Sequence, residues 1–150
     1  MLTMSLALLV ACGGDKVPDN IPVGDIAGKI DQAIDNTGDM VSIGDSYVIG
    51  MFGMDSSSYS EYMLKINAGQ NVDEYGIFKG KDKAQTEKIA EAVKGYLKTR
   101  DEAWMVEYMP EERPKVQNAE ALTVGNYVVY AILSDEDKSA AFDAFNEALK

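Results

Sequence analysis

A two-residue turn between two apolar segments is the feature that most restricts how this chain can fold. Gly125 and Asn126 separate the segments 116–124 and 127–133, which together are rich in valine and tyrosine. Glycine and asparagine tolerate the positive φ angles of a tight hairpin turn, and β-branched and aromatic residues favour strands. The sequence therefore predicts an antiparallel hairpin, with Gly125 and Asn126 as its structural turn.

Helices are expected on either side of the strands. Apolar residues at helical spacing predict a first helix that begins near Asp25. Ser134 is expected to cap a last helix, whose acidic first turn suits the helix dipole. The segment 42–55 is ambiguous, because tyrosine, valine and isoleucine favour a strand and two glycines weaken both structures. We expect a short helical turn there that ends near Gly53.

A long helix is predicted in the middle of the chain. It should begin at Asp82, which has capping-box chemistry with the glutamine three residues later. It should continue to about Tyr108, because Pro110 disfavours helix in the residue before it. Gly95 lies inside this helix at a cost of about 1 kcal/mol relative to alanine, which predicts close packing there.

The order of these elements indicates the fold class. Alternation of apolar residues predicts two more strands, over 59–66 and 73–79, which should pair antiparallel. Strands and helices in this order predict an α+β domain over residues 23–150. Its antiparallel sheet should have about four strands, with helices packed on one face.

The composition limits the chemistry that the chain can perform. Its 150 residues include no histidine and one cysteine, and the net charge is −11. Nucleophilic sites that rely on a histidine base are therefore excluded, as are an intrachain disulfide and a multi-cysteine metal site. The negative charge disfavours nucleic acid. We expect a non-enzymatic domain without cofactor or metal.

The amino-terminal segment has the pattern of a lipoprotein signal peptide. An uncharged run from Met1 leads to Leu-Val-Ala-Cys, a lipobox that ends at Cys12. Removal of residues 1–11 would leave Cys12 as an acylated first residue, and residues 12–22 read as a tether. The basic start of such signals is missing, so the true start is expected upstream. The alternative is a buried element with Cys12 as a core thiol, although two glycines follow at once.

Three segments in this order resemble a known family. They are Asp-Glu-Tyr-Gly-Ile-Phe-Lys at 73–79, Tyr-Met-Pro-Glu-Glu at 108–112 and Val-Gly-Asn-Tyr-Val at 124–128. Behind a lipobox they are similar to the domain of unknown function 4358 family, small lipoproteins mostly of Gram-positive bacteria. The resemblance covers roughly residues 25–149, and Phe-Gly-Met-Asp at 52–55 also fits. It implies a lipid-anchored protein at the outer face of the cytoplasmic membrane, and it brings no known activity or catalytic residue.

Weaker patterns leave other functions open. Gly-Asp-Ser at 44–46 resembles the nucleophile block of an esterase class that needs a histidine base, so a capped turn is expected instead. Asp31, Asp35 and Asp39 are spaced by four residues, which predicts a charged helix face more readily than a cation site. Pairs of carboxylates could serve a hydrolase, although 25 acidic residues produce such pairs by chance. The alternatives are a cation- or small-solute-binding lipoprotein and a carboxylate-based hydrolase of the cell envelope.

A candidate partner surface is predicted where the long helix ends. Loops carry function more often than the elements that they join. An aromatic side chain beside carboxylates suits a cationic or amphipathic partner, here an unknown protein or envelope component. The alternative is that this loop only fixes the helix end against the sheet. The residues expected to form the surface are Tyr108, Pro110, Glu111 and Glu112, with Glu74 nearby.

Overall fold

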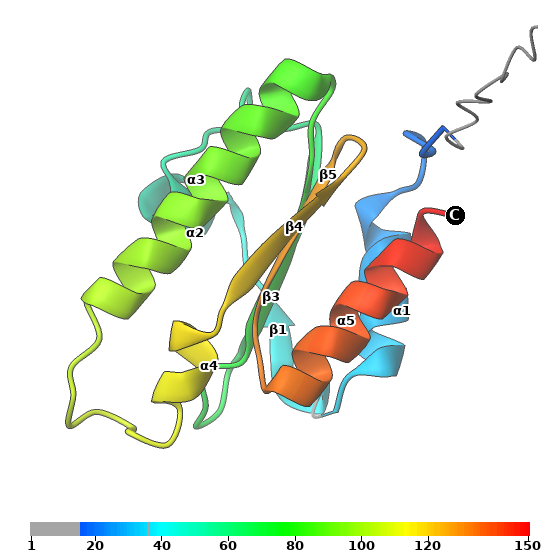
Figure 1. The fold of residues 1–150 in the computed structure, drawn as a ribbon. Helices are drawn as coiled ribbons and strands as arrows, with labels where there is room; N and C mark the ends of the chain where they lie inside the picture. The colour runs from blue at the N-terminus through cyan, green and yellow to red at the C-terminus, as the bar shows by residue number, and fades with distance from the viewer. Residues whose placement is uncertain (1–15, 36) are drawn as a thin grey trace, which may run out of the picture.

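Residues 16–35 and 37–150 are described by the computed structural model, in which a five-stranded antiparallel sheet lies between two layers of helices (Figure 1). The strand order is β1-β2-β3-β5-β4. The α+β class and the antiparallel sheet are thereby confirmed, with five strands instead of about four. The elements are α1 (Val23–Ala33), the 3-10 helix η1 (Thr37–Asp39), β1 (Met40–Ser42), α2 (Asp45–Phe52), β2 (Glu61–Asn67), β3 (Glu74–Lys79), α3 (Lys83–Glu102), α4 (Arg113–Gln117), β4 (Glu120–Val124), β5 (Tyr127–Ile132) and α5 (Asp135–Ala148).

The central strands β3 and β5 are covered on both faces. Ile77 and Val129 belong to a core with α1 and α5, whereas Phe78 and Tyr130 belong to a second core with α2 and α3. Figure 1 shows these helices on opposite sides of the sheet. The prediction that helices pack on one face was therefore wrong. All six residues of β5 are buried and apolar, a pattern typical of a strand covered on both sides.

The predicted hairpin is confirmed in position and type. Val124 pairs with Tyr127, so only Gly125 and Asn126 lie in the turn. Gly125 has a φ of +57°, a value that side chains disfavour. The predicted antiparallel pairing of the two earlier strands is also present, with Met63 opposite Ile77.

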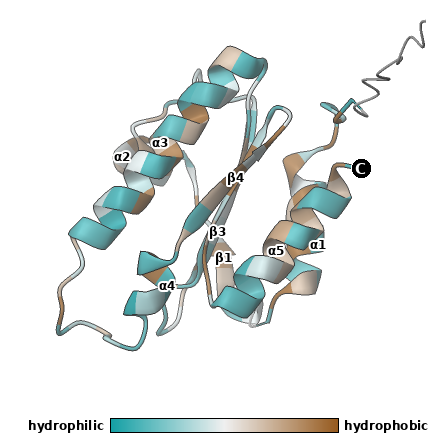
Figure 2. Ribbon diagram, in the orientation of Figure 1, coloured by the Kyte–Doolittle hydropathy of each residue, from teal (hydrophilic) through white to brown (hydrophobic). Residues whose placement is uncertain are grey.

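Two predicted helix starts are confirmed by their capping hydrogen bonds, whereas α1 begins at Val23, two residues before Asp25, and has no side-chain cap. The Asp82 carboxylate accepts from the backbone N–H of Gln85 at 2.8 Å, and the Ser134 hydroxyl accepts from that of Asp137 at 3.1 Å. The short helix α2 ends at Gly53, whose φ of +66° suits a left-handed cap. In Figure 2 the helices are two-toned, with teal surfaces alternating with brown. No helix within the two described ranges is long and apolar enough to cross a bilayer.

The long helix α3 ends six residues before the predicted position. Its last buried residue is Tyr96, so the turns beyond it have little contact with the sheet to support them. The chain leaves the helix at Ala103 and makes turns as far as the short helix α4, which begins at Arg113. Pro114 occupies the first turn of α4, where proline is favoured. The predicted strand from 116 therefore starts only at Glu120.

The segment that precedes α1 lies against the hairpin. Val17 and Ile21 are partly buried and pack on the core shared by α1 and α5. The Tyr127 hydroxyl donates to the carbonyl of Ile21 at 2.8 Å and accepts from its N–H at 2.9 Å. Val17 also contacts the turn at Gly125. Of the tether expected over residues 12–22, the part from Val17 onward is thus attached to the domain.

Candidate functional site

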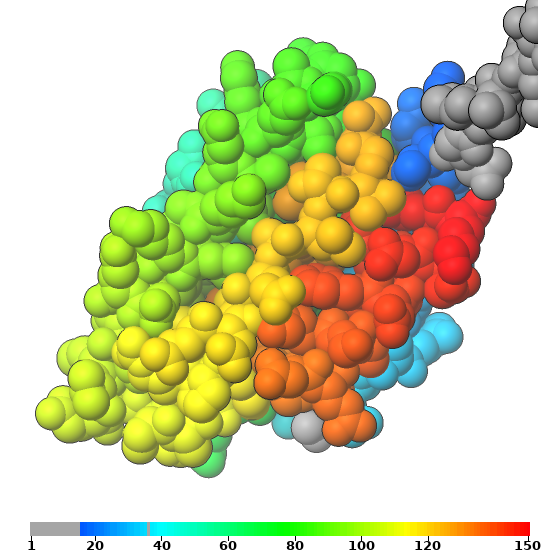
Figure 3. Space-filling view, viewed as in Figure 1, coloured from blue at the N-terminus to red at the C-terminus, as the bar shows by residue number. Residues whose placement is uncertain are grey.

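Large apolar side chains are exposed at the carboxyl end of α3. Met105, Val106 and Tyr108 are 68%, 74% and 56% exposed, and Met51 of α2 is 42% exposed. We call these four residues the distal patch. Figure 3 shows the loop that follows α3 as the yellow-green corner at lower left, and Figure 2 colours part of it as hydrophobic. Exposed apolar side chains that gather at one place often mark an interaction site.

The loop that carries the patch has a defined conformation. The backbone N–H of Tyr108 donates to the carbonyl of Met105 at 2.9 Å, and that of Glu112 donates to the carbonyl of Met109 at 2.9 Å. The Tyr108 ring lies 5.8 Å from the Trp104 ring. Met109 has a φ of +44°, the only positive value for a non-glycine residue in the described ranges. Such backbone strain costs about 1–3 kcal/mol and is often found at functional sites.

A cavity of about 280 Å³ opens beside the distal patch. Its walls come from α2, from the last two turns of α3 and from the loop that follows. Most of the lining is apolar, with one guanidinium and three aromatic side chains. The lining residues are Met51, Tyr96, Thr99, Arg100, Ala103, Trp104, Met105 and Tyr108.

Two residues that line this cavity each carry a hydrogen-bond donor that is not used. Nε of Arg100 and Nε1 of Trp104 are buried and have no partner among the described residues. Nη2 of Arg100 is 3.7 Å from Oε2 of Glu74, which is an ion pair but too long for a hydrogen bond. A buried donor without a partner costs about 1–3 kcal/mol, so such groups call for an explanation.

Behind the cavity, a buried carboxylate is held by tyrosines. Glu74 is 2% exposed, and its Oε1 accepts from the hydroxyls of Tyr130 at 2.5 Å and Tyr96 at 2.6 Å. The Tyr47 hydroxyl lies 3.2 Å from that of Tyr96 and extends the chain of hydrogen bonds. Gly76 is opposite Tyr130 in the sheet, and a Cβ there would collide with the Tyr130 ring. The glycine thus leaves the space through which Tyr130 reaches Glu74.

Burial governs the ionisation of this cluster. It raises the pKa of Glu74, because a charged carboxylate is poorly solvated there, and this outweighs the hydrogen bonds from Tyr130 and Tyr96 and the charge of Arg100. The pKa values of Tyr96 and Tyr130 are also raised, first by burial and then by the nearby Glu74. Both tyrosines therefore stay protonated and remain donors to the carboxylate.

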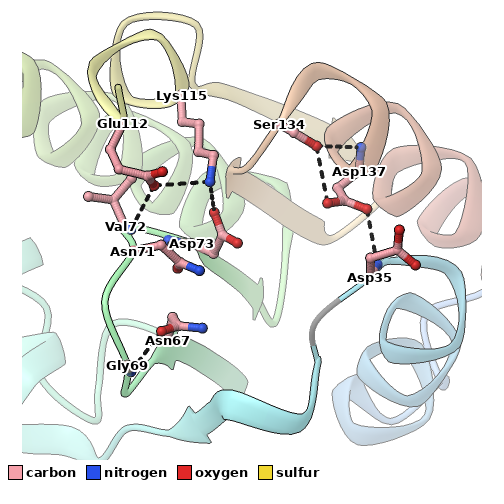
Figure 4. Close-up of polar contacts among 10 residues, drawn as sticks. All are labelled: Asp35, Asn67, Gly69, Asn71, Val72, Asp73, Glu112, Lys115, Ser134 and Asp137. Carbon is pink, nitrogen blue, oxygen red and sulfur yellow. Dashed lines mark hydrogen bonds and ion pairs between the residues drawn. The ribbon is translucent and has the colours of Figure 1, made fainter. Parts of the chain in front are cut away.

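The structure separates the residues predicted to form one partner surface. Tyr108, Pro110 and Glu111 are exposed on the loop as expected. Glu112 turns inward: its carboxylate accepts from the N–H of Val72 at 3.1 Å and pairs with Lys115 at 2.9 Å (Figure 4).

Lys115 also pairs with Asp73 at 2.8 Å, so Glu112 helps to fix α4 to the turn before β3 (Figure 4). Glu74 was predicted on this surface, which was wrong. Glu74 directly follows Asp73 in the sequence, but its side chain is buried under α3 and unavailable to a partner.

The other acidic patterns have ordinary contacts. Asp31 pairs with Lys65 and accepts from the Tyr75 hydroxyl, and Asp35 makes a separate contact with Asp137 through its N–H. No group of three or more possible metal ligands occurs in residues 16–35 and 37–150. Asp45, in the predicted capped turn, accepts from the Tyr62 hydroxyl at 2.7 Å. Cys12, the predicted lipidation site, lies outside the described residues.

A larger hollow of about 560 Å³ lies at the other end of α3, beside Gly53 and Ser58. Its polar groups serve the fold. The Gln85 side chain donates to the carbonyl of Ser57 at 2.9 Å, and its oxygen accepts from the N–H of Lys81 at 2.8 Å. The smaller cavity, with its unused donors, is the better candidate for a binding site.

Arg100 was missed as a site residue, although the sequence carried a signal for it. Ile89, Val93 and Tyr96 form the buried stripe of α3, and Arg100 occupies the next position of the same helical spacing. A cation on an apolar stripe needs a partner, so the position of Arg100 was itself the signal. Trp104 would continue the same stripe if α3 reached its predicted end, but it lies past the helix end in the cavity wall.

Comparison with known protein families identifies a match. The family model described as Domain of unknown function (DUF4358) matches residues 32–133. The matched region runs from the end of α1 to the end of β5 and contains the cavity, the distal patch and the Glu74 cluster. No curated protein and no solved structure matches the chain.

Proposed function

The chain belongs to the family described as Domain of unknown function (DUF4358), and we propose that it is a lipid-anchored binding domain at the outer face of the bacterial membrane. Its proposed task is to hold an amphipathic protein or envelope component. The lipobox that ends at Cys12 supports the anchor. The lack of histidine in the whole sequence supports a role in binding over hydrolysis.

The distal patch is the observation that carries the binding role. Met105, Val106 and Tyr108 have more than half of their surface exposed. Exposing large apolar side chains brings no stability to the domain itself, and a partner that covered them would gain about 25 cal/mol per Å² of buried apolar surface. Aromatic residues and methionine are also enriched in protein interfaces.

The path of the chain supports a partner that lies away from the bilayer. The attachment of Val17 and Ile21 to the hairpin leaves only residues 12–16 between a lipid on Cys12 and the domain. Five residues span at most roughly 18 Å. The hairpin end would then lie nearest the membrane. The loop after α3, which carries three of the four residues of the distal patch, is at the opposite end of the domain from the blue N-terminal segment (Figure 3).

The anchor is tested by the fate of Cys12. The gene is expressed from its natural start in its bacterial host, and wild type is compared with Cys12→Ala by detergent phase partitioning. Wild type should enter the detergent phase and the variant the aqueous phase, because stable anchoring requires acyl chains. If wild type behaves as a water-soluble protein, the lipid anchor is wrong.

The binding surface is tested by photo-crosslinking in living cells. A benzoylphenylalanine at position 108 should give a defined adduct, whereas the same residue at the exposed position 143 on α5 should not. Val106→Ser should reduce the adduct several-fold, because it removes apolar contact. Val41→Ser is the matched control, since Val41 is an exposed valine on the edge strand β1. Equal adducts from both positions, or no effect of Val106→Ser, would remove the distal patch as the working surface.

A further inference from the structure

The cavity beside the distal patch is lined by two residues, Arg100 and Trp104, each of which carries a buried hydrogen-bond donor that the described fold does not use. We propose that it binds a compact apolar group, aromatic or branched, that carries a carboxylate, with the carboxylate facing Arg100 and Trp104. This inference rests on the proposed function, because it names the chemistry that the same surface receives. The carboxylate could belong to a free small molecule or to the end of a peptide chain.

The two unused donors define where an acceptor would lie. Nε of Arg100 and Nε1 of Trp104 are both buried without a partner, and both residues line the cavity. Both donor atoms are covered in this conformation, so a ligand oxygen would reach them once the side chains around them shift, and it would then remove the cost of leaving them unpaired. Met105 and Tyr108 are exposed side chains at the mouth, and they can move aside by changes of rotamer on a fast timescale.

The charge at the base of the cavity favours an anion. Arginine stays protonated in proteins, and its planar fork matches a carboxylate in a bidentate way. The nearest counter-charge of Arg100 is Glu74, at 3.7 Å. That distance is too long for a hydrogen bond, so the guanidinium is left with donors for a second acid.

The walls and size of the cavity favour a compact apolar group. Met51, Ala103 and Met105 offer hydrocarbon and sulfur, and the Trp104 and Tyr108 rings offer aromatic faces. Thioether sulfur and aromatic rings both pack well on an aromatic ligand. A volume of about 280 Å³ is near the lower end of ligand sites, so one ring or one branched group fits.

The chain offers a direct probe of this site, because Trp104 is its only tryptophan. The full chain with Cys12→Ser, which prevents lipidation, is labelled with ¹⁵N, and the indole N–H signal is followed by NMR. Two acids are titrated, phenylacetate as a small molecule and N-acetylphenylalanine as a peptide end. Each acid is compared with its uncharged amide. This titration needs neither membrane nor partner, so its outcome is separate from the tests of the anchor and of partner capture.

At least one acid should shift the indole signal in a saturable way and bind about tenfold or more tightly than its amide, because a charged hydrogen bond is worth about 1.5–3 kcal/mol. Whichever acid binds more tightly identifies the source of the carboxylate. Arg100→Gln should reduce the affinity of the acid to that of the amide. Arg113→Gln is the matched control: Arg113 is the other arginine of the chain, with a side chain 28% exposed against 29% for Arg100. It should leave the affinity unchanged.

A second variant covers the case in which Arg100→Gln fails to fold. Trp104→Phe keeps an aromatic ring and removes the indole N–H, and the Arg100 side-chain N–H then serves as the reporter. Binding of the acid should weaken several-fold, while binding of the amide should change little. Equal binding of acid and amide to the wild-type chain, or the absence of a saturable shift with both acids, would overturn the proposal.

Discussion

The hydroxyl of Tyr130 lies 2.5 Å from Oε1 of Glu74, and both side chains are buried between the sheet and α3. The two residues come from neighbouring central strands, β5 and β3. A carboxylate in this position is stable only while hydrogen bonds compensate for the water that it has lost. The stability of the domain should therefore depend on the tyrosines that serve it.

Tyr130→Phe should lower the free energy of unfolding by about 1–3 kcal/mol, because Glu74 loses a donor in a buried place. Chemical denaturation monitored by circular dichroism measures the change. Tyr59→Phe is the matched control, since the buried Tyr59 hydroxyl has no partner in the described part of the chain. That variant should be neutral or slightly more stable. Equal losses in both variants would mean that the Glu74 contact does not matter.

Glu74→Gln should remove a pH dependence of stability. Burial raises the pKa of Glu74 above its ordinary value of 4.5, so the folded state holds this proton more tightly than the unfolded state does. The resulting stability is complete below about pH 4.5 and is lost as the pH rises through the folded pKa. Wild type should lose stability relative to Glu74→Gln as the pH rises above about 4.5, the ordinary value for this carboxyl. Parallel curves of unfolding free energy for the two proteins would contradict the raised pKa.

Two glycine-to-alanine changes should have opposite effects. Gly95→Ala should stabilise the domain by about 0.5–1 kcal/mol, because a Cβ there meets nothing within 4 Å and alanine favours helix. Gly76→Ala should destabilise it, because the new Cβ would collide with the Tyr130 ring. Melting temperatures by calorimetry compare the two variants. The close packing predicted at Gly95 was wrong, because a Cβ there has open space around it. A loss of stability in Gly95→Ala would instead support close packing at that position.

Gly125→Val should destabilise the domain by roughly 1–3 kcal/mol, because valine resists the φ of +57° in the turn. A Cβ at this position would also lie 2.7 Å from Cγ1 of Val17, so the segment before α1 should loosen. Hydrogen exchange at the Ile21 amide reports this loosening separately from the melting temperature. An unchanged melting temperature would contradict the strained turn.

The order of the main elements could be predicted because each has a local signal. Asp82 and Ser134 indicate helix starts because they can cap them, and Gly125 indicates the hairpin because it suits a tight turn. The coverage of the sheet depends on contacts between distant segments. The unbroken apolar run of β5 was the one clue that a second layer of helices existed, because such runs are typical of strands covered on both faces. Strand propensity alone does not distinguish them from strands covered on one face.

The candidate site was predicted in part, and the errors have one cause. Tyr108 and Glu111 are exposed because they lie on a loop, which sequence position indicates. Glu74 looks like a surface residue at the start of a strand, but Tyr130 and Tyr96 approach it from segments 56 and 22 residues away. Contacts of this range depend on strand order and helix packing, so a local pattern cannot report them.

The two hydrogen bonds between Ile21 and Tyr127 also determine how the domain would respond to mechanical load. Tyr127 lies in β5, next to the centre of the sheet, whereas β1, the first strand in the sequence, lies at its edge. A pull on the chain ahead of Val17 would reach β5 through Ile21 before it reached α1 or the edge strand. Tension applied at an anchored amino-terminal end would thus act first on the central strands β5 and β3, and the edge strand β1 would not be the first to separate from the sheet.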